Sequence, residues 1–331
     1  MKIGILTSGG DAPGMNAAIR AVVRTAIYHK IDVYGINRGY AGLLDKDISP
    51  LNVYSVADIL QKGGTILRTS RSEFFPTEAG QKRAAEVLRE YGIEHLIIIG
   101  GDGSLSGALA LKKLGVSVVG IPGTIDNDFG ASDFTIGFDT AVTTAIEAIG
   151  KIRDTTFSHN RINVVQVMGR TCGDIALYAG FSVGAEALII PEIETNLEGI
   201  CDRLLAGKDR GKLHSIVMLA EGCGSYRDYC KKIEELTQVT TKGTNLGYIQ
   251  RGGSPSHFDR NLASFMGYKA VEAIVNDNTG NVVVQRKGEY IMVPLEEALE
   301  TPKAFRKDMY KIAKILSISR FKKFDINNNI K

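Results

Sequence analysis

The sequence predicts an α/β protein with mostly parallel strands, and three observations support this prediction. Apolar runs that look like strands lead into glycine-rich or acidic loops and then into helices, as in Lys2–Thr7 followed by a helix from about residue 17 to 29. The apolar runs 96–99 and 118–119 enclose a predicted helix at 105–114, which completes a strand–helix–strand unit. A chain of 331 residues is also long enough for two sizeable cores.

The composition excludes several classes of protein. Hydrophobic residues make up 44% and charged residues 23% of the chain, which are ordinary globular values. The net charge of +3 and the lack of a basic block predict that the protein binds no nucleic acid. The four cysteines lack CxxC spacing and are expected to be reduced thiols of a cytoplasmic protein. No apolar run is long enough for a membrane span, and the first residues lead straight into a strand, so neither a span nor a signal peptide is expected.

The order of the remaining elements suggests two domains. Further elements are expected as strands at 33–36, 163–167 and 216–220, a short helix opening at 54–58, a helix at 138–149, a helix at about 258–275 and a hairpin at 280–293. We place the crossing between domains near Gly137 and the return near Gly252–Pro255. The predicted domains are 1–137 plus 251–303 and 138–250 plus 304–320, with a flexible tail at 321–331.

Two motifs in the central unit carry chemistry. In the first, GGDGS, Gly100, Gly101 and Gly103 lack Cβ atoms, so backbone N–H groups can approach an anion at the start of the following helix. Asp102 in the same turn suits a divalent cation that bridges phosphate oxygens. The second motif, PGTIDND, contains Asp126, which has the chemistry to accept a hydroxyl proton. A tight turn with solvated aspartates is the alternative, and the presence of both motifs in one unit disfavours it.

Other segments add candidates for phosphate binding. The Gly9-Gly10 loop after the first strand repeats the strand, glycine loop and helix pattern. Arg71 and Ser72 lie in a loop that suits a nucleotide polyphosphate, although a plain surface loop remains open. Arg161 and Arg170 are candidate phosphate ligands because a guanidinium group matches phosphate oxygens.

GGDGS followed by PGTIDND resembles the signature pair of the bacterial ATP-dependent 6-phosphofructokinases, and the likeness runs from Lys2 to about Ile318. The resemblance implies two similar three-layer Rossmann-like domains with the active site in the cleft between them. It implies a cytoplasmic, glycolytic kinase that transfers the γ-phosphoryl group of ATP to the C1 hydroxyl of fructose 6-phosphate. It also implies Mg²⁺ with ATP, a homotetramer, and regulation by ADP or a phosphoenolpyruvate-type effector.

The resemblance assigns residues to four roles. The catalytic residues are Asp126 as the base, Thr124, Arg71 and Arg170, with Asp102 as the metal ligand. The ATP site comprises Gly10, Tyr40 near adenine, Arg71, Ser72, Gly101, Asp102, Gly103, Ser104 and Gly107. The sugar-phosphate site comprises Thr124, Ile125, Asp126, Arg161 across a subunit boundary, Met168, Gly169, Arg170, Glu221, Lys242, Tyr248 and Arg251. The effector site comprises Arg20, Arg24, Val53, Tyr54, Asp58, Arg153, Gly184, Glu186, Arg210, Lys212 and His214.

Three positions depart from the family pattern and leave alternatives open. Lys242 replaces a usual arginine and Tyr248 a usual histidine in the sugar-phosphate pocket, while Val53 replaces a common effector-site arginine. The altered pocket allows a kinase for a related sugar phosphate, or a regulatory subunit without turnover. Pyrophosphate-dependent relatives carry aspartate at the Gly103 position and lysine at the Gly123 position, so both glycines favour ATP. A nicotinamide-dependent oxidoreductase would leave PGTIDND without a role.

Overall fold

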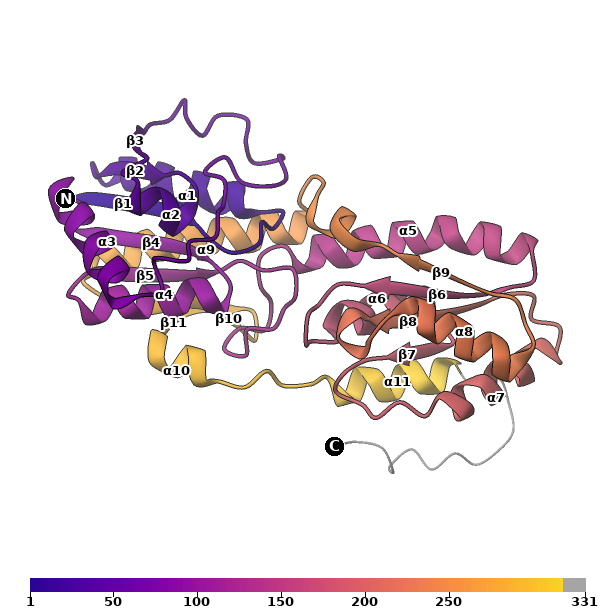
Figure 1. Cartoon of the computed structure of the whole chain (residues 1–331). Helices are drawn as coiled ribbons and strands as arrows, with labels where there is room; N and C mark the ends of the chain where they lie inside the picture. The colour runs from indigo at the N-terminus through magenta and orange to yellow at the C-terminus, as the bar shows by residue number, and fades with distance from the viewer. Residues whose placement is uncertain (318–331) are drawn as a thin grey trace. The chain divides into compact units, whose positions relative to one another are not determined.

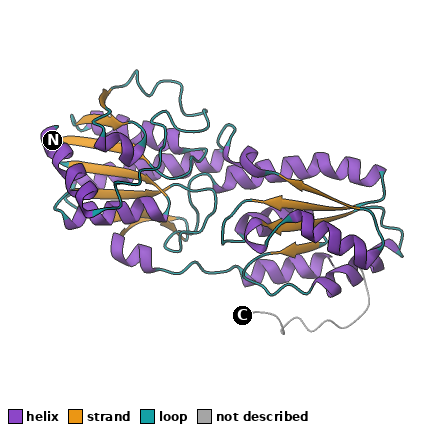
Figure 2. Ribbon diagram, viewed as in Figure 1, coloured by secondary structure: helices purple, strands orange, loops and turns teal. Residues whose placement is uncertain are grey.

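A computed structural model describes residues 1–317, which form two compact units. Unit 1 contains Met1–Ile125, Phe129–Thr140 and Arg251–Lys303, and unit 2 contains Asp126–Asp128, Ala141–Gln250 and the described residues from Ala304 on. In each unit helices cover the faces of a mostly parallel sheet (Figures 1 and 2), which confirms the predicted fold class. The tail predicted at 321–331 lies outside the described residues.

Unit 1 is built on a seven-stranded sheet in the order β11-β10-β5-β4-β1-β2-β3. The strands are β1 (Lys2–Thr7), β2 (Asp32–Ile36), β3 (Ile48–Leu51), β4 (His95–Gly100), β5 (Ser117–Pro122), β10 (Asn281–Arg286) and β11 (Glu289–Pro294). Only the outer strands β3 and β11 pair antiparallel, and β10 with β11 forms the predicted hairpin. The central strands are buried on both faces, which explains why their sequences are continuous apolar runs.

Helices cover both faces of this sheet. They are α1 (Met15–Tyr28), α2 (Gly39–Leu44), α3 (Glu78–Glu90), α4 (Asp102–Lys113), α9 (His257–Val275) and α10 (Leu295–Glu300). Gly267 lets α9 approach α1 closely, because a Cβ there would lie 2.7 Å from the Ala18 carbonyl oxygen. The first and last parts of unit 1 are therefore packed on one another.

Unit 2 has a four-stranded, fully parallel sheet in the order β7-β8-β6-β9. Its strands are β6 (Ile162–Val167), β7 (Ala187–Ile189), β8 (Ser215–Ala220) and β9 (Thr241–Asn245). Its helices are α5 (Phe138–Ser158), which begins in unit 1, α6 (Asp174–Val183), α7 (Leu197–Lys208), α8 (Tyr226–Thr237) and α11 (Lys307–Ser317), with 3-10 turns η1 (Glu221–Cys223) and η2 (Gly247–Arg251).

Two local predictions need correction. Helix α4 begins at Asp102 rather than Leu105, because the extended Gly101 acts as its N-cap and accepts from the Leu105 N–H at 3.0 Å. Asp102 and Gly103 therefore stand in the first helical turn and not in a separate loop. The short helix predicted at 54–58 is a series of turns, and Asp58 has a left-handed backbone with φ of 52° that ends any helical path.

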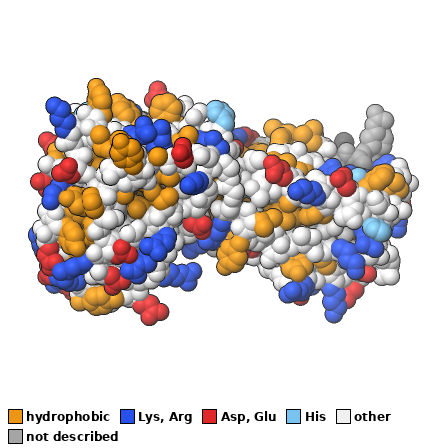
Figure 3. Space-filling view, turned by 90° about the horizontal axis from the view of Figure 1, so that it is seen from above, with side chains coloured by type: hydrophobic (Ala, Val, Ile, Leu, Met, Phe, Trp, Pro, Cys, Tyr) orange, Lys and Arg blue, Asp and Glu red, His pale blue; other side chains and the backbone are white. Residues whose placement is uncertain are grey.

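Two features of the described residues concern their hydropathy and their surface charge. Among residues 1–317, no helix is both long and apolar enough to cross a bilayer. On the face drawn in Figure 3, Lys and Arg side chains are interspersed with Asp and Glu, and no block of one sign dominates. This agrees with the small net charge of +3.

A buried carboxylate holds the start of α5. The side chain of Asp259, which is fully buried, accepts from the Gly137 N–H at 2.9 Å, the Thr140 N–H at 2.8 Å and the Thr140 hydroxyl at 2.6 Å. Burial is the main cause that raises the pKa of Asp259 to about 6, against an ordinary value of 3.8. When protonated, the carboxyl group can donate to the Thr140 hydroxyl oxygen instead.

This raised pKa predicts how stability depends on pH. Because the folded state holds the Asp259 proton more tightly than the unfolded state, the stabilisation is complete below pH 3.8 and is lost as pH rises through about 6. The free energy of unfolding of the wild type should therefore fall relative to that of Asp259→Asn across this window, as measured by urea unfolding at several pH values. The exposed Asp45→Asn variant should keep the wild-type trend. A gap between wild type and Asp259→Asn that does not change with pH would contradict the prediction.

Candidate active site

The two signature motifs leave neighbouring parallel strands at the same edge of the unit 1 sheet. Strands β4 and β5 pair in register, with Gly100 opposite Pro122, and the Gly123 N–H donates to the Gly100 carbonyl oxygen at 3.0 Å. The loop after β1 belongs to the same edge, because the Ser8 N–H donates to the Ile99 carbonyl oxygen at 3.0 Å. The structure thus brings the Gly9-Gly10 loop, the GGDGS turn and the start of PGTIDND together, as expected at the carboxyl ends of parallel strands.

The glycines of these loops have distinct roles. A Cβ at Gly100 would lie 2.5 Å from both the Ser104 hydroxyl and the Ser8 carbonyl oxygen, so close packing of the two loops requires glycine here. Gly103 is exposed and has no atom within 4 Å of an added Cβ. It therefore lies in open space on the first turn of α4, where a bound anion would meet the positive end of the helix. Gly10 lies against the guanidinium of Arg251, whose Nη1 would be 2.8 Å from a Cβ.

Asp102 suits Mg²⁺ that is bound mainly through a nucleotide. Its side chain is exposed in the first turn of α4, beside the anion position at the N-terminus. Within residues 1–317 no group of three or more His, Cys, Asp or Glu side chains forms a metal cage. Mg²⁺ usually keeps several waters and takes one or two carboxylates plus substrate phosphates, so a single carboxylate at a phosphate site fits this ion.

A polar residue that the sequence analysis did not single out holds the Arg71 loop. Asn16 is buried at the start of α1, where its amide donates to the carbonyl oxygens of Lys62 and Gly63 at 3.1 and 3.2 Å and accepts from the Ile66 N–H at 2.8 Å. The Thr7 hydroxyl donates to the Arg68 carbonyl oxygen at 2.9 Å. The sequence pattern that could have predicted this role is a single asparagine among the apolar residues of the first helical turn.

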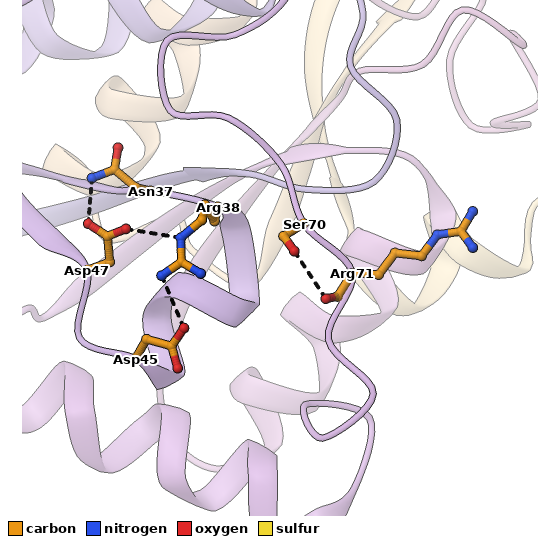
Figure 4. A network of polar contacts seen from close by, with 6 residues as sticks. All are labelled: Asn37, Arg38, Asp45, Asp47, Ser70 and Arg71. Carbon is orange, nitrogen blue, oxygen red and sulfur yellow. Dashed lines mark hydrogen bonds and ion pairs between the residues drawn. The ribbon is translucent and has the colours of Figure 1, made fainter.

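The guanidinium of Arg71 points away from its neighbours, as Figure 4 shows. In the same view Arg38 is held by Asp47 at 3.2 Å and Asp45 at 3.1 Å. The Arg71 guanidinium, in contrast, makes no ion pair with any residue between 1 and 317, and its backbone carbonyl accepts from the Ser70 hydroxyl at 3.3 Å. Arg71 thus retains its full capacity for a phosphate.

Tyr40 and Gly107 support the site from below. Tyr40 is only 5% exposed, its ring stacks on Phe75 at 3.8 Å, and its hydroxyl donates to the Ser104 carbonyl oxygen at 2.6 Å. Gly107 is buried beneath both rings, where a Cβ would lie 2.8 Å from each. Burial also raises the pKa of the Tyr40 phenol, so it stays a neutral donor. Tyr40 thus supports the N-terminus of α4, and its expected contact with adenine stays a prediction.

The acidic loop is anchored by its middle residue. Asn127 has φ of 51°, and its amide donates to the Asp174 carboxylate at 2.8 Å between two side chains that are nearly inaccessible to water. Asp126 beside it is 5% exposed, whereas Asp128 lies 3.6 Å from the Arg170 guanidinium. Asp126 and Asp128 therefore occupy different environments, the first buried and the second paired with Arg170.

The segment Met168-Gly169-Arg170 follows β6 in unit 2 and is tightly constrained. Gly169 has φ of 132°, and a Cβ there would lie 2.4 Å from the Cys172 carbonyl oxygen. The backbone N–H of Arg170 donates to the Glu221 carboxylate at 2.9 Å, and the N–H of Met168 donates to the buried Gln250 amide oxygen at 3.3 Å. Met168 and Ile125 are themselves buried, so their side chains serve packing. Glu221 therefore fixes the Arg170 turn in addition to any role toward a sugar.

The structure separates the predicted sugar-phosphate ligands of unit 2 into two groups. Arg170 and Glu221 follow the carboxyl ends of β6 and β8, and the 80% exposed Tyr248 follows β9. Arg161 precedes β6, and Lys242 on β9 pairs with Asn163 near the amino end of β6. A six-residue strand spans roughly 20 Å, so one chain does not bring these groups into one pocket.

Part of the predicted effector set forms a charged cluster in unit 2. Glu186 pairs with Lys212 and accepts from the Ile216 N–H, while Arg153 donates to the Val183 carbonyl oxygen. Burial is the main cause that lowers the pKa of His214, and the charges of Arg153 and Lys212 lower it further against the opposing effect of Glu186. Arg161, Lys212 and His214 also line one cavity of about 230 Å³.

The remaining predicted effector residues lie in unit 1, or in unit 2 at Gly184 and Arg210. Arg20 and Arg24 stand on α1, with Arg24 exposed, and Val53 and Tyr54 are exposed in the turns that end at Asp58. In unit 2, Gly184 is the left-handed C-cap of α6, and Arg210 lies in the turn after α7. Each is consistent with a surface site, and each remains a prediction.

In unit 1, the glycine turns at one edge of a parallel α/β sheet and the guanidinium of Arg71, which is unpaired within the described residues, have the chemistry to bind phosphate groups. Comparison with known proteins gives the family: a family model described as Phosphofructokinase matches residues 2–274. A relative from Clostridium botulinum (strain Loch Maree / Type A3), named ATP-dependent 6-phosphofructokinase, is 54% identical over 315 residues, covering 95% of this chain and 99% of that protein. A relative of the same name from Clostridium acetobutylicum shows the same identity and coverage. The chain belongs to the phosphofructokinase family.

Solved structures agree with this assignment. Phosphofructokinase from Saccharomyces cerevisiae is similar with a TM-score of 0.84 and 35% identity over 95% of this chain. The chain spans only 46% of the yeast chain. A pyrophosphate-dependent phosphofructokinase from Marinobacter aquaeolei has a TM-score of 0.80 at 22% identity, covering 93% of this chain and 86% of that chain. At that identity the likeness shows a shared fold alone.

The anchor of the acidic loop gives a test by stability. Asn127→Gly keeps the left-handed backbone without strain and removes only the amide that donates to Asp174. Loss of a buried hydrogen bond to a charged group should lower the free energy of unfolding by about 1.5–3 kcal/mol. Asn160→Gly is a matched control, since Asn160 is exposed with φ of 50°. Equal effects of the two substitutions in denaturant unfolding would show that the Asn127–Asp174 contact contributes nothing.

Proposed function

We propose that this chain transfers the γ-phosphoryl group of ATP to the C1 hydroxyl of fructose 6-phosphate. The main support for the proposal is the register of β4 with β5. Because of this register, the glycine turn that suits a phosphate and the acidic loop begin at the same edge of the sheet. The 54% identity to relatives named ATP-dependent 6-phosphofructokinase over nearly their whole length supports it. The reaction places the chain in glycolysis.

The transfer follows from the residues of these loops. The Asp126 carboxylate accepts the C1 hydroxyl proton while the sugar oxygen attacks the γ-phosphorus and the bond to the β–γ bridging oxygen breaks, which releases ADP. Thr124 lies two residues before Asp126 and positions the acceptor. Arg71 and Arg170 neutralise charge on the transferring group. The low exposure of Asp126 keeps bulk water away from the base.

The donor is bound at the N-terminus of α4. Backbone N–H groups of residues 101–103 and Gly10 contact its phosphates, and Ser104 closes this turn by donating its own N–H to the Gly101 carbonyl oxygen at 2.9 Å. Mg²⁺ held by Asp102 and the phosphates would neutralise charge between the β- and γ-phosphates when bound. The open space at Gly103 leaves room for a nucleotide-linked phosphate, and an aspartate there would repel it.

The donor and the activity are tested by one steady-state assay of the pure protein. With Mg²⁺ and fructose 6-phosphate, we expect turnover with ATP and none with pyrophosphate. Faster turnover with pyrophosphate would reject the assignment of the donor. No turnover with any of ATP, GTP or pyrophosphate would support the regulatory-subunit alternative, and faster turnover with another sugar phosphate would reject the acceptor.

The base is tested by an isosteric change. Asp126→Asn keeps the size of the side chain but cannot accept the proton, so kcat should fall by about 10²–10⁴-fold with little change in nucleotide affinity. Asp308→Asn, which alters an exposed carboxylate paired with Arg306, should leave kcat unchanged. A kcat for Asp126→Asn within about threefold of wild type, well below the range typical of a general base, would remove Asp126 from this role.

We also propose a homotetramer in which Arg161 and Lys242 act on the sugar phosphate of a neighbouring subunit. Their position at the opposite end of β6 from Arg170 supports this arrangement. Subunit mixing tests it: Asp126→Asn and Arg161→Ala proteins, each impaired alone, should recover activity after they are dissociated and reassembled together. Asp126→Asn mixed with Arg170→Ala should not recover, because both residues belong to one chain's site. Equal outcomes for the two mixtures would reject the shared site.

The effector residues support a further proposal, that ADP or a small phosphorylated metabolite binds a second anion site. The cluster of Arg153, Glu186, Lys212 and His214 in unit 2 and the arginines of α1 supply its charges. In the assay above, such an effector should shift the saturation curve for fructose 6-phosphate. If none of these compounds shifts the curve, the site does not regulate, and Val53 in place of arginine is the first departure to examine.

A further inference from the structure

A second cavity in unit 2 is not explained by the proposed function. It has a volume of about 250 Å³ and lies between β7, the first turns of α7 and the helix α11, which run beside one another in Figure 1. Of its lining residues only Glu186 belongs to the sites described above. The cavity is thus a separate feature, and the last described helix, α11, forms one of its walls.

Two cations and a phenol line this cavity. Arg203 on α7 and Lys314 and Tyr310 on α11 are all partly buried in its wall. The Lys314 Nζ lies 5.5 Å from the centroid of the Tyr310 ring. Neither Arg203 nor Lys314 forms an ion pair with any residue of the described range. The three polar groups therefore line a common space, in which neither cation is paired with a carboxylate of the described residues.

The electrostatics of the pair agree with this geometry. Burial lowers the pKa of both Arg203 and Lys314, and the charge of Arg203 lowers the pKa of Lys314 further. Burial raises the pKa of Tyr310, which stays a neutral donor. Two like charges in a half-buried space destabilise one another, and a bound anion would relieve that repulsion.

The carboxylates near the cavity do not pair with Arg203 or Lys314. Glu186 is already paired with Lys212 and accepts from the Ile216 N–H. Glu194 also lines the cavity, but it is exposed and forms no ion pair with Arg203 or Lys314. Asp202 adjoins Arg203 on α7 but is exposed and does not line the cavity.

We propose that this cavity binds a small organic phosphate, with Arg203, Lys314 and Tyr310 as the groups that hold its phosphate. The buried side chains of Ile193 and Ile200 and the half-buried Ala313 form an apolar wall for the rest of the ligand. The volume is below the ~300–1,000 Å³ of most drug-sized sites, so the ligand is of metabolite size. Arg203 supplies the fork that matches phosphate oxygens, and Lys314 supplies a point charge.

Pyridoxal 5′-phosphate is a direct probe of this site in the full-length protein. Its aldehyde condenses with a lysine ε-amine to form an imine with loss of water, and borohydride then delivers hydride to give a stable secondary amine. Peptide mapping measures labelling at each lysine. Lys314 should be labelled faster than the exposed Lys311 on the same helix, and inorganic phosphate should protect Lys314 but not Lys311.

Phosphate-free pyridoxal separates anion binding from simple reactivity of the amine. The preference for pyridoxal 5′-phosphate over pyridoxal should be about tenfold or more greater at Lys314 than at Lys311, as expected for a charge-assisted contact. Arg203→Met should abolish this excess preference, and Arg227→Met, which alters an exposed arginine of α8, should preserve it. Equal preferences at the two lysines, no labelling of Lys314, failure of phosphate to protect, or an unchanged result in Arg203→Met would each overturn the proposal. These readouts do not depend on turnover, so failure of the kinase assignment would not affect them.

Discussion

The parallel pairing of β4 with β5 is the constraint on which the proposed donor site depends. Because Gly100 stands opposite Pro122 and the Gly123 N–H bonds to the Gly100 carbonyl, the two signature loops start at the same level of the sheet. A slip by one residue would turn every side chain of one strand to the opposite face of the sheet and shift its loop relative to the other. The Ser8 N–H adds the first glycine loop to the same edge, and Gly100 permits the close contact of these loops. Phosphate recognition here is thus a consequence of strand register.

In each unit, polar side chains hold the loops that carry the proposed chemistry. Asn16 bonds to the backbone on both sides of the Gly63-Gly64 turn, Asn127 bonds to Asp174, and Glu221 accepts from the Arg170 N–H. Each bond satisfies a group that would be costly to bury alone, and each determines one backbone turn. The exposed guanidinium of Arg71 remains available because its support comes from the backbone around it. Rigid loops with available charges suit a reaction in which positioning and electrostatics do most of the work.

The unit 2 sheet distributes its cations differently. Arg161 and Lys242 lie toward one end of β6 and Arg170 toward the other, so a phosphate bound by all three requires more than one chain. This arrangement also bears on the substitution of lysine for the usual arginine at position 242. The ammonium group of Lys242 keeps the positive charge of an arginine but cannot form two parallel hydrogen bonds to a phosphate. The substitution therefore weakens selection for the orientation of the phosphate more than it weakens the electrostatic attraction to it. Arg203 and Lys314 form a separate cationic pair between α7 and α11.

The sequence alone determined the α/β class, the central strand–helix–strand unit, and the family resemblance from GGDGS and PGTIDND, because apolar periodicity and glycine spacing are local properties of the chain. It also placed the β10–β11 hairpin, whose turn is short. It did not show that α4 begins at Asp102, since that depends on how Gly101 is capped. Nor did it show that Tyr40 bonds to the Ser104 carbonyl oxygen, that Asp259 holds Gly137 and Thr140, or that Lys242 on β9 lies beside Asn163 near the amino end of β6. Those facts belong to the tertiary structure, because each depends on contacts between segments, or on a strand's direction in the sheet, that no local pattern encodes.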